Sequence, residues 1–290
     1  MEYAGYNVDE RYSDIVEPNL YYDAVLQPGV TYSDKFQGDG VGAGLVHIYK
    51  LGEGEVKDPK APASDFSHEN AENELVDLRL NNTQNKSEKI YRVQADAVPY
   101  AMAEEHLAAA TVNCRAGWQA SGLACLVNEG TDLGDTAALT KSNIKNKVLE
   151  SRKKVRKGKA IANVVLASVD TYTTMLEAAG DQYTPMTNDE IMQSGQIGHW
   201  LGMLWVECNM FDLLNAAKYY DYTGTLQTVD LTAVDFVMYD YNGFSIVDNL
   251  ETIRLKDSEN FNGVLAQVEI NSGYRVPTAA RVVVKKHAAE

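Results

Sequence analysis

The feature that most constrains the fold is a tract of about sixty residues, 36–94, that shows no core of its own. It opens with the glycine-rich run FQGDGVGAGLVHIYKLGEGEV, passes Pro59 and Pro62, and continues as the polar run SDFSHENAENELVDLRLNNTQNKSEK. Only two short alternating runs, residues 45–51 and 75–80, could pair as strands. Structureless connections longer than about 15 residues are uncommon inside a compact domain. We therefore expect this arm to be disordered or to be ordered by neighbouring molecules.

Composition bounds the class of protein. A chain of 290 residues favours one large domain or two small ones, and its 45% apolar content is enough for a core. The 41 acidic and 26 basic residues give a net charge of −15. This balance argues against a sequence-reading nucleic-acid binder, which needs a basic footprint, but it allows nucleic acid to be enclosed.

The expected compartment is a reducing cytoplasm. The acidic amino terminus shows no secretory signal, and apolar runs such as AIANVVLASV are about half the roughly 20 residues that span a bilayer. The cysteines are odd in number and lack CxxC spacing, which disfavours disulfide frameworks and structural zinc. They are Cys114, Cys125 and Cys208.

Hydrophobic periodicity predicts a few helices followed by antiparallel strands, which is an α+β order without the alternating βα units of a nucleotide-binding sheet. We expect a long spine helix over residues 100–128 and a helix capped by Thr140 that buries Ile144, Val148 and Leu149. Further expected elements begin with a strand in AIANVVLAS, a helix ending at residue 180, a loop with a short helical piece at 183–196 and one strand in GHWLGMLWVECNMF. The last third should contain strands at 235–239, 252–255, 265–270, 274–276 and 280–285, with a helical link at 243–247 and a hairpin turn at 271–273.

Candidate chemical groups are few, and each has a simpler structural explanation. One histidine among acids on a polar loop is more often a solvated tip than a metal site. Acids in the first turn of the spine helix suit its dipole, and Cys114 suits a core position. Glu207 and Cys208 should point to opposite faces of a strand. The groups considered are His68, Glu69, Glu72 and Glu74; Glu104, Glu105 and His106; and His199, Glu207 and Cys208.

No GxGxxG, P-loop, GxSxG or HExxH pattern occurs in the sequence. We therefore expect no enzyme, and we assign no catalytic, cofactor-binding or metal residues and no cofactor. The basic run ESRKKVRKGK is typical of a solvated helix end.

Four runs, in order, resemble the major capsid protein of tailed bacteriophages with the Hong Kong 97-type fold. They are AIANVVLASVDTYTTML, SGQIGHWLGMLWVECNMF, DFVMYDYNGFSIV and LKDSENFNGVLAQVEINSGYRVPTAARVVVKK. The glycine-rich arm is similar to the family's extended loop, and the helix from Tyr100 to its spine helix. The resemblance covers residues 9–286.

The resemblance implies a division into parts. These are an N-terminal arm with the first strand (1–35), an extended loop (36–88), a discontinuous peripheral domain (89–130 and 248–275) and an axial domain (131–247 and 276–290), with its tip near 183–198. Some members of the family join subunits through a lysine and an asparagine. None of Lys50, Lys57 and Lys60 can be matched to that chemistry, so cross-linking is not carried over.

The resemblance also implies function and partners. Copies would form hexamers and pentamers in an icosahedral shell around double-stranded DNA, in the virion and, during assembly, in the host cytoplasm. A scaffolding protein, a portal and a decoration protein are the other expected partners, and no membrane is expected. Alternatives are an encapsulin-like nanocompartment shell, a soluble α+β enzyme or binding domain with a mobile acidic loop, and a tail-tube or adaptor protein.

Overall fold

The computed structural model describes residues 24–40, 44–52, 73–97, 101–180 and 198–288. They divide into two compact units. One contains Thr83–Trp118 and Leu250–Asn271, and the other contains Asp23–Asn82, Gln119–Asn249 and Ser272–Glu290. Among the described residues, no helix is long and apolar enough to cross a bilayer.

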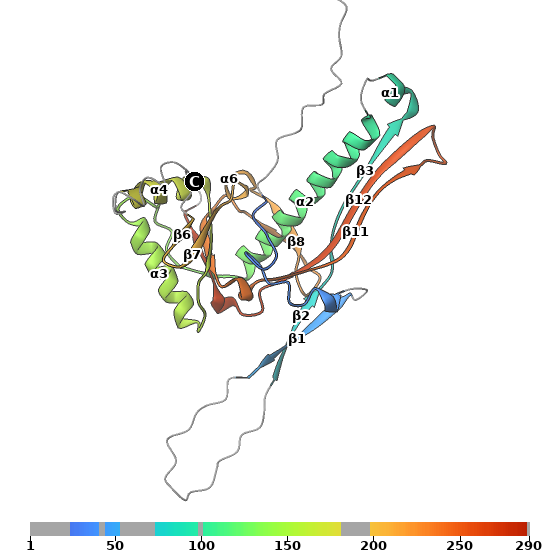
Figure 1. Cartoon of the computed structure of the whole chain (residues 1–290). Coiled ribbons are helices and arrows are strands. Elements are labelled where there is room, and N and C mark those ends of the chain that lie inside the picture. The colour runs from blue at the N-terminus through green and yellow to red at the C-terminus, as the bar shows by residue number, and fades with distance from the viewer. Residues whose placement is uncertain (1–23, 41–43, 53–72, 98–100, 181–197, 289–290) are drawn as a thin grey trace, which may run out of the picture. The chain divides into compact units, whose positions relative to one another are not determined.

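The larger unit is built on a mixed six-stranded sheet, ordered β4-β13-β10-β5-β7-β6 (Figure 1). The central strand β10 is antiparallel to both of its neighbours, β13 and β5, whereas β5 and β7 are parallel. Every residue of β5 and β10 is buried, as expected for strands covered on both faces. The strands are Thr131–Asp132 (β4), Val164–Ala167 (β5), His199–Trp200 (β6), Met203–Glu207 (β7), Val234–Tyr239 (β10) and Val282–Lys286 (β13).

Two helices pack on one face of this sheet, α3 (Ile144–Lys157) and α4 (Val169–Gly180). Their apolar sides share a cluster with alternate residues of the sheet, including Val165, Phe236 and Val283. A short helix, α6 (Met210–Leu213), follows β7, and the unit also carries 3-10 turns at Gly38–Gly40, Tyr241–Gly243 and Ala279–Arg281.

Two hairpins belong to the larger unit. One pairs β1 (Leu45–Leu51) with β2 (Asn73–Arg79), and the other pairs β8 (Ala217–Tyr220) with β9 (Leu226–Val229). Both pairs are antiparallel, and the β1–β2 ribbon projects away from the six-stranded sheet (Figure 1). The prediction that residues 45–51 and 75–80 contain pairing strands is confirmed.

The smaller unit contains a three-stranded sheet, ordered β11-β12-β3, and the first part of the long helix α2 (Met102–Glu129). The strands are β3 (Asn82–Tyr91), β11 (Ser245–Asp257) and β12 (Gly263–Arg275), and the short helix α1 (Arg92–Ala97) follows β3. Ala110 and Cys114 of α2 pack against Val268 and Ile270 of β12. The predicted long helix and the core position of Cys114 are therefore confirmed.

Four local expectations are wrong. The 271–273 turn lies inside the continuous strand β12. The expected single strand over GHWLGMLWVECNMF is a β6–β7 hairpin, because Leu201 (φ 54°) and Gly202 (φ 76°) turn the chain, and α6 follows. The helical turn expected at 243–247 ends at Gly243, and β11 begins at Ser245. The polar residues of β3 form a strand that was not expected.

The helix α3 also differs in detail. Its N-cap is Asn143, and Thr140 instead lies one turn earlier, where its carbonyl oxygen accepts hydrogen bonds from the backbone N–H groups of Asn143 and Ile144. Leu149 is 46% exposed, since it lies on the flank of the helix, and Val155 is buried in the core. The expected helical piece at 183–196 lies outside the described residues.

Candidate assembly surfaces

The β1–β2 hairpin has one buried and one exposed face. Val46 lies opposite Leu78, and Ile48 lies opposite Val76. Since side chains alternate along a strand, these four share one face, and they are buried in an apolar cluster with Val247 of β11. This cluster attaches the ribbon to its own unit. For the described part of residues 36–94, the expectation of a tract without its own core, ordered only by neighbouring molecules, is therefore wrong.

The opposite face carries exposed apolar side chains. Tyr49 lies opposite Leu75, and Leu51 follows on the same face. Their exposed fractions are 72%, 56% and 79%. We call these three residues the outer hairpin patch. It is next to a hydrogen bond between His47 Nδ1 and Asp77 Oδ1, which are 2.7 Å apart. Exposed apolar groups gathered on one face indicate an interaction surface rather than scattered surface residues.

The base of the hairpin is fixed by specific contacts. The side chain of Gln37 accepts a hydrogen bond from the backbone N–H of Asp248 (2.9 Å) and donates one to its carbonyl oxygen (2.5 Å). A Cβ at Gly273 would lie 2.7 Å from the carbonyl oxygen of Arg79, so β12 passes β2 at a distance that only glycine allows. These contacts set the direction in which the outer hairpin patch points.

A largely buried ion pair fixes the junction between the end of α2 and β12. Arg275 Nη1 lies 2.7 Å from Glu129 Oε1, and Glu129 Oε2 accepts the backbone N–H of Val276 at 2.8 Å. The Arg275 guanidinium also stacks 3.9 Å above the ring centroid of Tyr222. Burial raises the pKa of Glu129, even though Val276 and Arg275 act to lower it. The pair is therefore a structural contact that removal of either partner would destabilise.

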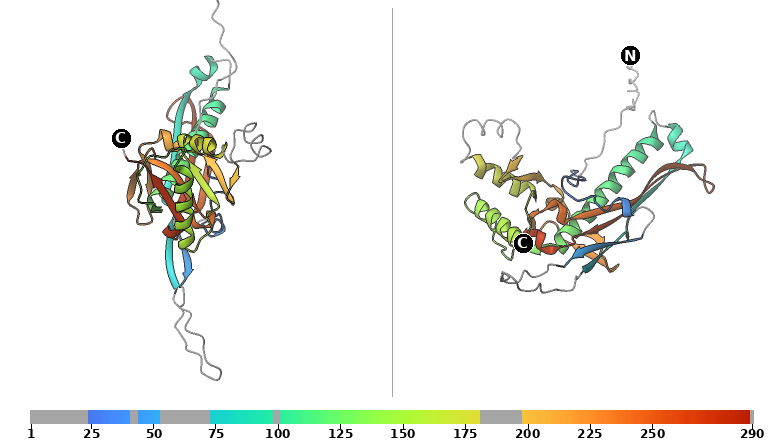
Figure 2. Two further views of the ribbon diagram at one scale, coloured as in Figure 1. Left: turned by 90° about the vertical axis from the view of Figure 1, so that its left-hand side faces the viewer. Right: turned by 60° about the horizontal axis from the view of Figure 1, so that its bottom comes forward.

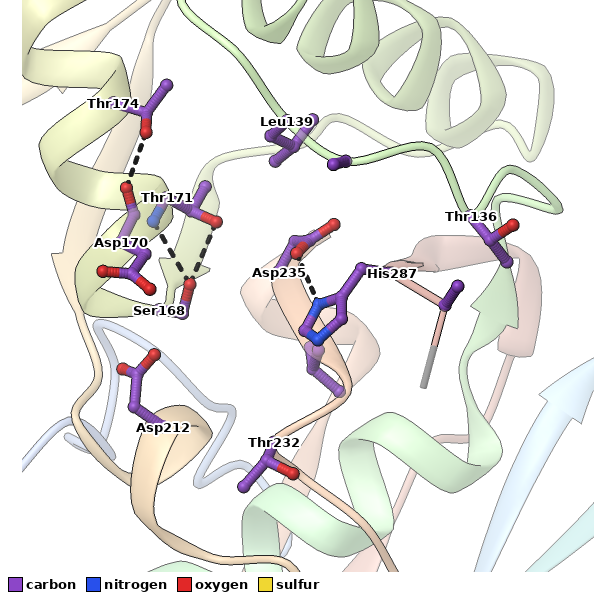
Figure 3. Close-up of a pocket in the computed structure, with 13 residues that line it drawn as sticks. Thr136, Leu139, Ser168, Asp170, Thr171, Thr174, Asp212, Thr232, Asp235 and His287 are labelled. Carbon is purple, nitrogen blue, oxygen red and sulfur yellow. Dashed lines mark hydrogen bonds and ion pairs between the residues drawn. The ribbon is translucent and has the colours of Figure 1, made fainter. Parts of the chain in front are cut away.

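Asp235 and His287 line a cavity of about 590 Å³ (Figure 3), and Asp235 also pairs with a buried lysine. The fully buried Lys285 Nζ donates to the carbonyl oxygen of Ala137 at 2.8 Å and lies 3.2 Å from Asp235 Oδ2. His287 Nδ1 is 2.8 Å from the other oxygen of Asp235. The remaining cavity lining is mostly threonine and aspartate, and the Asp212 carboxylate accepts the backbone N–H of Val169. The bond from Lys285 to Ala137 holds the last strand, β13, against the loop before α3.

The candidate chemical groups of the sequence do not form a common site. His106 pairs with Glu88 of β3 at 2.8 Å, and Glu104 and Glu105 are exposed in the first turn of α2. His199 is exposed in β6, Glu207 ends β7, and Cys208 is fully buried. In the part of the chain that the structure describes, no three metal-ligating side chains are grouped.

The candidate residues on the arm are only partly within the described structure. Glu74 pairs with Lys50 across the hairpin, with Lys50 Nζ 3.0 Å from its Oε2. His68, Glu69, Glu72, Lys57 and Lys60 lie outside the described residues. The outer hairpin patch itself was not singled out from the sequence. Its signal is that LVHIYKL carries apolar residues on both faces of the strand, which is more than one buried face requires.

No protein-family model and no curated protein matches this sequence. Solved structures do match it. A chain from Mycobacterium phage Che8 is 18% identical, with a TM-score of 0.76 and 98% of both chains covered. The capsid of cyanophage P-SCSP1u gives 9% identity and a TM-score of 0.69, covering 97% of this chain and 93% of the other. The mature capsid of bacteriophage PhiM1 gives 14% identity and a TM-score of 0.62, covering 99% of this chain and 95% of the other.

The chain therefore has the fold of phage capsid proteins over nearly its whole length. This confirms the α+β fold and the resemblance to tailed-phage capsid proteins that the sequence patterns indicated.

Proposed function

We propose that this chain is a major capsid protein, a structural and non-catalytic component of a phage virion that assembles into an icosahedral shell around double-stranded DNA. The observation that carries the proposal is the likeness to phage capsid structures across 97% or more of this chain in the matches described above. A likeness of this extent includes the hairpin as well as the sheets.

Assembly is the mechanism. The outer hairpin patch leaves Tyr49, Leu51 and Leu75 exposed in a single chain, and contact with a neighbouring copy would remove them from water. Such a contact is heterologous, since one surface meets a different surface of the next copy, and repeated heterologous contacts generate rings. Individual contacts can be weak, because closure makes many of them act together.

The parts keep the roles that the resemblance implies. Residues 1–35 are the N-terminal arm, 36–88 the extended loop, 89–130 and 248–275 the peripheral domain, and 131–247 with 276–290 the axial domain. Hexamers and pentamers of the chain make the shell. A scaffolding protein, a portal and a decoration protein are its further partners during assembly in the host cytoplasm.

Electron microscopy of the purified protein tests this proposal. Samples across a series of protein and salt concentrations should contain closed particles or regular tubes. Monomers that persist across the whole series would contradict the proposal. Closed particles that retain protein cargo and exclude nucleic acid would favour a nanocompartment shell instead.

A further inference from the structure

The helix α3 is strongly cationic in an acidic protein. Its fourteen residues, IKNKVLESRKKVRK, contain seven lysines and arginines and one glutamate. The helix thus contributes +6 to a chain whose net charge is −15. Figure 2 (right) shows α3 at the outer edge of its unit. A concentration of one sign of charge at one surface marks a candidate binding surface for the opposite charge.

The geometry of the helix divides these cations into two groups. The buried side is Ile144, Val148, Ser151 and Val155, which face the core. Lys147 Nζ pairs with Asp135, and the Lys154 ammonium donates to the carbonyl oxygen of Asp132. The other five cations occupy the remaining surface of the helix. They are Lys145, Arg152, Lys153, Arg156 and Lys157, and we call them the α3 cationic surface.

These five side chains have no carboxylate partner within 4 Å among the described residues. Several cations elsewhere among the described residues do have a carboxylate partner. Lys86 Nζ lies 2.6 Å from Glu88, and Arg115 Nη2 lies 2.9 Å from Glu251. The single acid of the helix, Glu150, is already bound to Lys147 at 3.1 Å. The α3 cationic surface is therefore not neutralised locally, although the chain has an excess of carboxylates.

We propose that the α3 cationic surface binds the phosphate backbone of duplex nucleic acid. The inference rests on the proposed shell function and deepens it, because it names the surface of the subunit that contacts the enclosed DNA. The contact is to phosphates, so it carries no sequence preference.

Linear charge density favours a duplex over an acidic protein segment. From Lys145 to Lys157 the helix rises about 18 Å. Over that length a duplex presents about ten phosphate charges, at one per about 1.7 Å. An extended peptide with a carboxylate at every second residue presents only about three charges, at about 3.3 Å per residue. A duplex can therefore pair with all five cations, and an extended acidic strand cannot.

The test is duplex DNA binding by the full-length protein, measured by fluorescence anisotropy from 50 to 200 mM salt. Five phosphate contacts predict that the association constant falls about 500-fold over this range. The variant Arg152→Gln/Arg156→Gln keeps three contacts and should show a fall of only about 40-fold, with weaker binding at 50 mM. The control Lys218→Gln/Lys256→Gln has the same net charge and alters exposed lysines elsewhere, so it should behave like the unmodified protein.

Three results would overturn the inference. They are absence of binding at 50 mM salt, equal effects of the two double variants, and competition by polyglutamate as strong as competition by an unlabelled duplex of equal charge. The last result would assign the surface to an acidic protein. Shell formation by the same samples, seen by electron microscopy, is an independent readout. Shells that bind no duplex refute only this inference, whereas a failure to form shells under all conditions counts against the proposed function.

Discussion

Replacing Leu51 by serine should weaken assembly without weakening the fold. Leu51 is 79% exposed in the single chain, so almost all of its side chain is available for burial against another copy. Complete burial of a leucine side chain contributes about 1.5–3 kcal/mol. The exposed part is therefore worth about 1–2 kcal/mol per contact, which corresponds to a 5- to 30-fold change in the association constant.

A substitution on the opposite face of the same strand, β1, serves as the control. Ile48 lies three residues earlier on the buried face of β1 and is 6% exposed. Truncating a buried isoleucine costs about 2–5 kcal/mol, so Ile48→Ser should lower the melting temperature by about 4 °C or more. Leu51→Ser should leave the melting temperature unchanged and raise the protein concentration needed for assembly.

Light scattering against protein concentration, with particles identified by electron microscopy, measures that threshold. A Leu51→Ser threshold within twofold of that of the unmodified protein would refute the assignment of the outer hairpin patch to a subunit contact. A melting temperature lowered equally by both substitutions would refute the two-faced description of the hairpin.

Three further outcomes are expected from buried groups. Gly273→Ala should lower the free energy of unfolding by about 1–3 kcal/mol. The control Gly38→Ala should leave it unchanged, because nothing lies within 4 Å of the new methyl group. Equal denaturation curves for the two variants would contradict the close approach of Arg79 to Gly273. Arg275→Leu removes a group that lowers the pKa of Glu129, so folded Glu129 holds its proton to higher pH. A protein with such a group loses stability as pH rises above the unfolded pKa of that group, about 4.5. The melting temperature of the variant should therefore fall more steeply as pH rises above this value, and adding Glu129→Gln should remove that pH dependence. A thiol reagent should react slowly with the native protein and rapidly once it is denatured, and a fast native reaction would contradict the burial of all three cysteines, Cys114, Cys125 and Cys208.

The local sequence pattern was sufficient to predict the elements that bury a continuous apolar face. The strand β5 and the helix α4 follow directly from AIANVVLAS and VDTYTTMLEAAG, and β10 follows from the apolar run FVMY. The helix α2 could be predicted because nearly thirty residues without proline carry a stripe at helical spacing. In each case the information lies within the segment itself.

The features that could not be predicted depend on contacts with residues that are distant in the sequence. The strand β3 is polar along most of its length and forms because β12 supplies its hydrogen-bonding edge. Gly273 looked like a turn residue, but it lies within the continuous strand β12, where the close approach of Arg79 requires glycine. Lys285 lies in a run that ends in basic residues, and its burial depends on Asp235, fifty residues earlier. No local pattern distinguishes these cases.

The two proposed surfaces should respond to salt in opposite directions. Copies that each carry −15 repel one another when they assemble, and salt screens this repulsion, with a Debye length of about 8 Å at 0.15 M. Burial of the outer hairpin patch is apolar and is not weakened by screening, so added salt should favour shell formation. The α3 cationic surface binds phosphates by displacing their counterions, so the same salt should weaken its hold on a duplex. Measured on one preparation, shells that dissociate with rising salt would show that charge pairing, and not apolar burial, holds the subunits together.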